Sequence, residues 1–147
     1  MYEYEYSLET IASAEAIYAL YEDVNAWRRW DLGIEHIEMN GPFAVGSNGV
    51  MKVNGQPPLD FCLTRVEPNR GFTDETPLPH VGIVVIFSHQ ITPLDNNRTR
   101  ITHQVKIVGP AAETVGPQIG PMITSDLPEA VAKLAEIALA TEHETNP

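Results

Sequence analysis

The segment from Val85 to Ile107 constrains the fold most, because two strand-like runs flank a short polar turn. We interpret Asp95-Asn96-Asn97 as a three-residue loop, a type I turn closed by an asparagine in the left-handed region. Residues whose numbers sum to 192 then face each other across the hairpin. One face carries the pairs Val85/Ile107, Phe87/Val105, His89/His103 and Ile91/Ile101, and the other carries Ser88/Gln104, Gln90/Thr102 and Thr92/Arg100.

Length and charge narrow the class of protein. The chain has 147 residues, which suits one domain, and we expect it to span residues 1–141 before a polar tail at 142–147. Nine basic residues against twenty acidic ones give a net charge of −11, which argues against nucleic acid as a partner. No apolar run is long enough for membrane insertion, and Met1–Tyr6 does not resemble a signal peptide, so a cytoplasmic location is expected.

The order of the expected elements indicates an α+β domain. Tyrosines alternate with glutamates over Tyr2–Leu8, which predicts a half-buried strand, and two short helices follow at Ala14–Tyr21 and Val24–Trp30. After Gly109-Pro110 a helical period continues to about Ala140, with a kink or break expected at Pro128. Between these helical regions, six strands of an antiparallel meander are predicted at Ile34–Met39, Gly49–Val53, Leu59–Val66, Phe72–Glu75, Val81–Ile91 and Arg98–Val108.

Four segments carry a resemblance to a known superfamily: Ile11–Tyr18, Val24–Asp31, Thr99–Pro110 and Leu127–Leu134. They resemble the START-like or Bet v 1-like (SRPBCC) superfamily, which includes polyketide cyclase/dehydrase relatives. The resemblance implies a helix-grip fold, in which a curved antiparallel sheet grips a long C-terminal helix and two short helices follow the first strand. It specifies a fold rather than a reaction, because one fold serves many functions.

His89 and His103 are the candidate catalytic residues. Directly opposed side chains in a hairpin have Cβ atoms roughly 4.5–5.5 Å apart, so the two rings could share a proton, a water or a ligand oxygen. The alternative is two core histidines, bonded to each other or to the tyrosines of the first strand. No metal site is expected, because no spacing brings His36, His80 or His143 toward the pair.

Other side chains are candidates for contact with a ligand. Arg65 follows the alternate apolar residues Leu59, Phe61 and Leu63, an alternation that would point it toward the cavity mouth. The favoured interpretation is instead a strand-end arginine paired on the surface with Glu67 or another carboxylate. Related aromatase/cyclases use cavity arginines and tyrosines to hold the carbonyls of a polyketide, but the residues around Arg65 do not match those enzymes closely. The full set of ligand-binding candidates is Tyr4, Tyr6, Trp30, Arg65, Phe87, His89, His103, Leu127 and Val131.

Three functions are compatible with the sequence. The first is binding of a small hydrophobic ligand, such as a lipid, between the sheet and the C-terminal helix, without a cofactor. The second is a polyketide cyclase/dehydratase-like enzyme that uses the same cavity and its His and Arg residues on a polyketide-like molecule. The third is an interaction module resembling the activator of a chaperone ATPase. A monomer or a homodimer is expected in each case.

Overall fold

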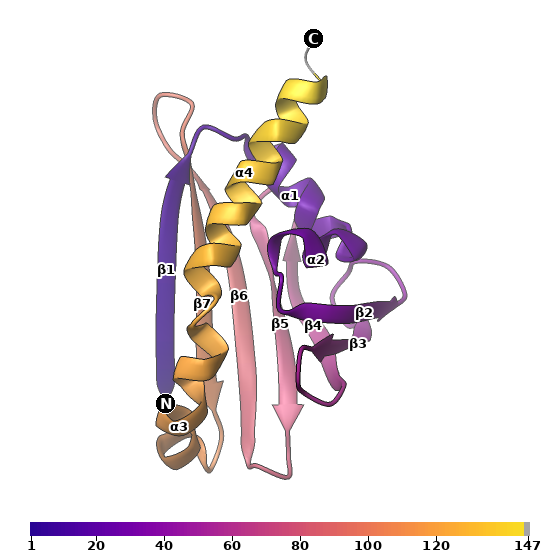
Figure 1. Ribbon diagram of the computed structural model, residues 1–147, viewed down its shortest axis with the longest axis vertical. Coiled ribbons are helices and arrows are strands. Elements are labelled where there is room, and N and C mark those ends of the chain that lie inside the picture. The colour runs from indigo at the N-terminus through magenta and orange to yellow at the C-terminus, as the bar shows by residue number, and fades with distance from the viewer. Residues whose placement is uncertain (146–147) are drawn as a thin grey trace.

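The computed structural model describes residues 1–145, with side chains through Glu142. One curved antiparallel sheet contains seven strands in the order β1-β7-β6-β5-β4-β3-β2 (Figure 1). The first strand of the chain, β1, therefore lies at one edge of the sheet beside the last strand, β7. The bounds are β1 Tyr2–Thr10, β2 Ile34–Asn40, β3 Asn48–Val53, β4 Leu59–Glu67, β5 Gly71–Leu78, β6 Ile83–Pro93 and β7 Thr99–Val108.

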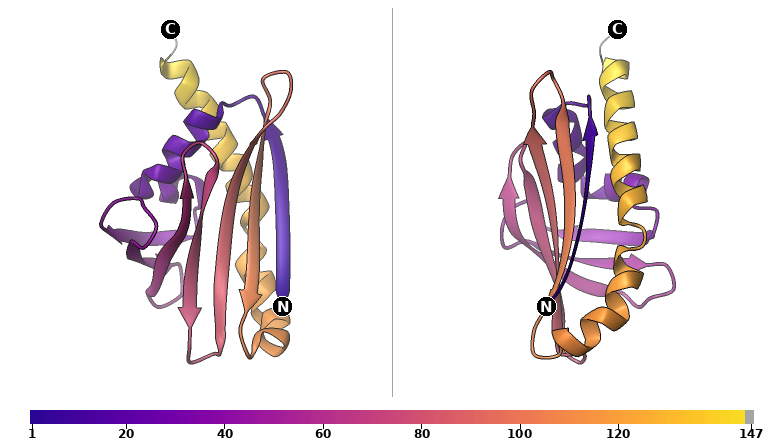
Figure 2. Two further views of the ribbon diagram at one scale, coloured as in Figure 1. Left: turned by 180° about the vertical axis from the view of Figure 1, so that it is seen from behind. Right: turned by 90° about the vertical axis from the view of Figure 1, so that its left-hand side faces the viewer.

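Helices cover one face of the sheet. Between β1 and β2 lie α1 (Ala14–Glu22), a 3-10 turn (Val24–Ala26) and α2 (Trp27–Trp30). The Ser13 hydroxyl accepts a hydrogen bond from the Ala16 N–H and so caps α1. The C-terminal helices α3 (Ala112–Thr124) and α4 (Leu127–Thr145) run along the concave side of the sheet (Figure 2).

The predicted break near Pro128 is present between α3 and α4, at residues 125–126. Proline fits early in a helix, because the first N–H groups have no partner inside the helix. The last helix continues to Thr145, beyond its expected end at Ala140, so the residues expected as a polar tail are helical as far as they are described. Residues 146–147 lie outside the described part of the chain.

The register of the β6–β7 hairpin is the predicted one. His89 pairs with His103 and Ile91 with Ile101. The turn itself differs from the prediction, because both Asn96 and Asn97 have positive φ angles, of 62° and 58°, which excludes a type I turn. Asparagine tolerates this region better than most residues, so two in succession allow a tight turn of left-handed residues.

The apolar interior consists of two clusters. The larger joins α1, α2 and α4 to the sheet around Tyr21, Phe61, Phe72 and Leu134. The smaller lies where α3 covers β6 and β7, around Val85, Val105 and Ile107. On the interior face of β5, the buried polar side chains of Asp74 and Thr76 follow Phe72. None of the described helices has the length and apolar character required to span a bilayer.

Candidate functional site

The two predicted histidines lie together in the interior, inside a cluster of aromatic rings. Their ring centroids are 4.6 Å apart and the ring planes are nearly perpendicular. The His103 Nε2 atom shares a hydrogen bond of 2.8 Å with the Tyr21 hydroxyl, and His89 Nδ1 donates to the Phe72 carbonyl at 3.3 Å. Phe72 stacks on His89 with centroids 4.0 Å apart, and Trp30 contacts both imidazoles edge-on.

Burial keeps both imidazoles neutral. Loss of solvation lowers the pKa of His103 to about 3. It also holds the pKa of His89 well below its usual value, and the neighbouring His103 adds to this effect. A general acid or base works best with a pKa near the working pH, so these values suit core residues better than proton carriers. The catalytic role of the pair stays a prediction.

Tyr21 is the residue that holds His103, and sequence analysis had considered only the first-strand tyrosines for this role. We expect Tyr21→Phe to lower the free energy of unfolding by about 1–3 kcal/mol, because it leaves a buried ring nitrogen without its partner. Urea denaturation at pH 7 measures the loss. Tyr18→Phe is the matched control. Like Tyr21, Tyr18 is a buried tyrosine of α1, but its hydroxyl makes no hydrogen bond among residues 1–142. Equal losses in the two variants would contradict the assignment.

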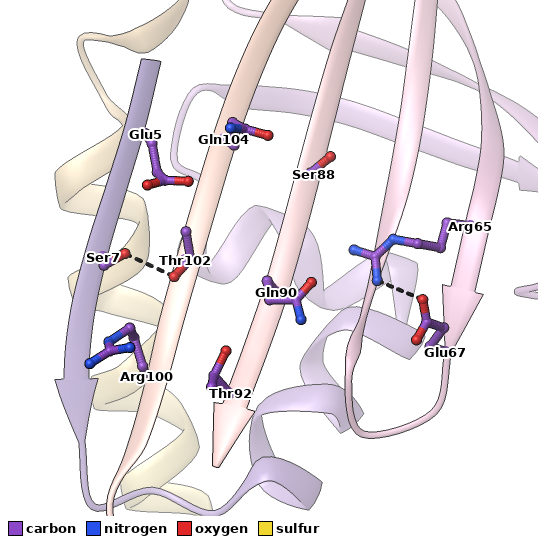
Figure 3. Close-up of a pocket in the computed structure, with 10 residues that line it drawn as sticks. All are labelled: Glu5, Ser7, Arg65, Glu67, Ser88, Gln90, Thr92, Arg100, Thr102 and Gln104. Carbon is purple, nitrogen blue, oxygen red and sulfur yellow. Dashed lines mark hydrogen bonds and ion pairs between the residues drawn. The ribbon is translucent and has the colours of Figure 1, made fainter. Parts of the chain in front are cut away.

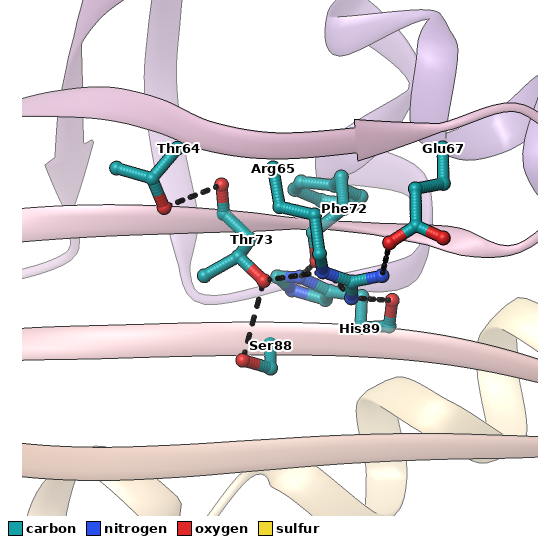
Figure 4. A network of polar contacts seen from close by, with 7 residues as sticks. All are labelled: Thr64, Arg65, Glu67, Phe72, Thr73, Ser88 and His89. Carbon is teal, nitrogen blue, oxygen red and sulfur yellow. Dashed lines mark hydrogen bonds and ion pairs between the residues drawn. The ribbon is translucent and has the colours of Figure 1, made fainter. Parts of the chain in front are cut away.

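Arg65 pairs with Glu67, as the favoured interpretation of the sequence predicted, and the cavity position is wrong because the side chain lies on the outer, convex face of the sheet. An irregularity between Leu63 and Arg65 shifts the β4–β5 register, which reverses the alternation of side chains. The guanidinium is held there by Thr73 Oγ1, Glu67 and the carbonyl oxygens of Phe72 and His89, at 3.0–3.3 Å (Figure 4). Arg65 therefore braces the outer side of the strands that carry the imidazoles.

A groove of about 590 Å³ crosses the outer face of the sheet (Figure 3). Its side chains come from alternate positions of β1, β4, β6 and β7, and they are hydroxyls, amides, carboxylates and guanidiniums. This composition is typical of the solvated face of an antiparallel sheet and does not suit an apolar ligand. The lining consists of Glu5, Ser7, Arg65, Glu67, Ser88, Gln90, Thr92, Arg100, Thr102 and Gln104.

A second hollow, of about 230 Å³, lies on the helical side, where the segment after α2 faces the α3–α4 junction. Trp30 forms part of its wall, and the same indole contacts the two imidazoles. Trp30 therefore belongs both to the wall of the hollow and to the aromatic cluster around the histidines. It is lined by Trp30, Asp31, Leu32, Gly33, Asn54, Asp126, Glu129 and Ala130.

Buried polar groups without hydrogen-bond partners among the described residues lie on α2 and β5. The Trp30 indole N–H and the Thr76 hydroxyl are buried, and neither has a hydrogen-bond partner among the described residues. Asp74, two residues before Thr76 on β5, is 4% exposed and pairs in register with the interior residue Phe87. Burial, with the negative charges of Asp31 and Glu75, raises the pKa of Asp74 to about 8. Burial also raises the pKa of Asp31 to about 6, and Asp126 contributes.

Sequence analysis did not identify Asp74, Thr76 or Asp31. The alternation of Phe72, Asp74 and Thr76 was visible, but the register between β5 and β6 was needed to place the two polar residues inside. Of the ligand-binding candidates, Trp30 lines the hollow, while Val131 is fully buried in the larger cluster. Four other candidates are half-buried: Tyr6 lies against the larger cluster, Phe87 and Leu127 against the smaller one, and Tyr4 on the interior face of β1 opposite Val105.

No set of three or more His, Cys, Asp or Glu residues in the described chain is placed to hold a metal ion. The side chain of His143 lies outside the described residues.

Comparison with solved structures identifies the fold. Norcoclaurine synthase from Thalictrum flavum superposes with a TM-score of 0.73 at 18% identity, covering 93% of this chain and 92% of that one. Protein MLL2253 from Mesorhizobium loti gives 0.71 at 15% identity, with 95% and 98% covered, and Ara h 8.0201 gives 0.74 at 9% identity, with the same coverage. No family model matches the sequence, and no curated protein matches it.

The chain thus has the helix-grip fold of the Bet v 1/START-like (SRPBCC) superfamily, as the four sequence segments predicted. Proteins with the Bet v 1-like fold commonly bind hydrophobic ligands. The fold alone does not define the ligand, because its binding residues vary while the architecture is kept.

Proposed function

We propose that this protein binds a small, largely apolar molecule in the hollow between the segment after α2 and the α3–α4 junction. The observation that carries the proposal is the position of Trp30, a buried indole of the aromatic cluster, in the wall of this hollow. Small-molecule sites are concave and combine aromatic side chains with a few polar groups, and this hollow has both.

The fold supports this proposal. Norcoclaurine synthase from Thalictrum flavum has been solved in complex with dopamine and hydroxybenzaldehyde, two small aromatic molecules, and it shares the architecture described above. The hollow of about 230 Å³ is somewhat smaller than typical drug-sized sites of roughly 300–1,000 Å³. A molecule with a single ring suits it better than a long lipid or a polyketide chain.

Catalysis by the histidines is less favoured, because their low pKa values and close aromatic neighbours leave them neutral and enclosed. An interaction module is also less favoured, since the large apolar side chains that are most exposed belong to separate segments of the chain. These are Met1, Ile11, Leu32, Val45 and Met122.

Native mass spectrometry after gentle purification tests the proposal, together with titration of the neutral probes indole and 2-phenylethanol followed by protein NMR. We expect a retained molecule or probe binding with shifts at Trp30, Leu32 and Ala130. Trp30→Ala should weaken binding at least tenfold. Asp60→Asn, on the exposed side of β4, should leave it unchanged. A bare chain that binds neither probe, or probe binding unaffected by Trp30→Ala, would overturn the proposal.

A further inference from the structure

We propose that the ligand of this hollow carries a positively charged amine, held between Asp31 and Asp126, with its apolar body against Trp30. The inference rests on the proposed function and adds the chemical class of the ligand. It follows from three features of the hollow: its charge, the geometry of two carboxylates, and the wall formed by Trp30.

The ionisable groups that line the hollow all have one sign. They are Asp31, Asp126 and Glu129, and the lining contains no lysine, arginine or histidine. An ammonium ion is favoured in such a site, whereas a carboxylate or phosphate is repelled. The negative charge of the hollow therefore favours an apolar molecule with an ammonium group over one with a carboxylate or a phosphate.

Two of the carboxylates converge over a glycine. A side-chain carbon built on Gly33 would lie 3.5 Å from Asp31 Oδ1 and 3.7 Å from Asp126 Oδ2. Because residue 33 has no side chain, the space next to both oxygens stays free for a ligand atom. The two carboxylates come from different parts of the chain, one after α2 and one at the α3–α4 junction, so the tertiary fold creates this arrangement.

Trp30 supplies the other half of the site. Its side chain is 3% exposed and lines the hollow. An indole ring near an ammonium group also gives a cation–π attraction. An amine attached to a ring or short apolar chain would use both the carboxylates and the indole.

The electrostatics of the neighbouring groups are consistent with a cationic ligand. Asp31 faces Asp126 from the α3–α4 junction, accepts a hydrogen bond from the Gly33 N–H and lies near Asp74 of β5. Burial and the charge of Asp126 raise the pKa of Asp31 to about 6, although the Gly33 hydrogen bond acts to lower it. A bound ammonium would offset this repulsion and lower the pKa. Amine binding should therefore release protons and tighten as the pH rises from 5 to 7.5.

Calorimetric titration with three probes of similar size tests the inference: 2-phenylethylamine, 2-phenylethanol and phenylacetate. At pH 7.5 we expect the amine to bind at least tenfold more tightly than the alcohol, and phenylacetate to bind more weakly than either. Asp126→Asn should remove most of the preference for the amine while the alcohol binds as before. Asp60→Asn is the matched control, since it removes one exposed carboxylate outside the site.

The outcomes separate this inference from the proposed function. Equal binding of amine and alcohol, with both lost in Trp30→Ala, would overturn the amine proposal and leave ligand binding intact. Failure of all three probes would overturn both. An amine preference that persists in Asp126→Asn and in Asp31→Asn would show non-specific attraction to an acidic protein, and would overturn the assignment of the site.

Discussion

Replacing Phe72 by alanine should lower the free energy of unfolding by about 3–5 kcal/mol, a large part of the stability of a domain of this size. Phe72 is fully buried at the centre of the aromatic cluster. Its ring stacks on His89 and on Trp27, with centroids 4.0 and 5.2 Å away, and meets Tyr21 edge-on at 5.0 Å. The contacts come from α1, α2 and β6, so the cavity left by the substitution cannot collapse by moving one element.

Urea denaturation followed by far-UV circular dichroism measures the effect. Phe43→Ala is the control: Phe43 contacts the same ring edge-on at 5.3 Å but is only half-buried and lies in the loop between β2 and β3. We expect it to cost less than half as much. A loss below about 1 kcal/mol for Phe72→Ala would show that the cluster is loosely packed, and would reopen the interior beside the histidines as a ligand site.

Asp74→Asn should stabilise the protein at pH 8 by several kcal/mol, and change its stability by less than about 1 kcal/mol at pH 4. The pKa of Asp74 is raised to about 8 in the folded protein, because the carboxyl is buried beside other acids. In the unfolded chain it ionises near its ordinary value of 3.8. The folded state therefore holds the proton more tightly, and stability is lost as the pH rises from about 4 to 8. Asparagine has no proton to lose and avoids this cost.

The measurement is the difference in unfolding free energy between variant and wild type at several pH values, which cancels the contributions of other titrating groups. That cancellation matters here, because the histidines act in the opposite direction: their lowered pKa values cost stability as the pH falls below about 6.5. Asp60→Asn, which removes an exposed carboxylate of β4, is the control for the loss of one negative charge. A pH-independent difference for Asp74→Asn would contradict a buried, destabilised carboxyl.

The sequence by itself determined the architecture and one strand pairing. The alternation of apolar and polar residues determined which face of β6 and β7 is buried. A slip of one residue in the pairing would have moved every apolar side chain of one strand to the solvent face, so only one register was possible. The order of elements and the four family-like segments then identified the helix-grip fold. These features depend on residues that are close in sequence, or on a hairpin whose turn is short.

The tertiary structure alone decided the site. Arg65 faces outward because an irregularity in β4 reverses the alternation that placed it inside, and such an irregularity leaves no signal in the apolar pattern. Asp74 became an interior residue only through the β5–β6 register, and Asp31 and Asp126 meet only because the α3–α4 junction reaches the end of α2. Distances between elements far apart in the chain arise from the sum of all their contacts, and no local pattern of residues specifies them.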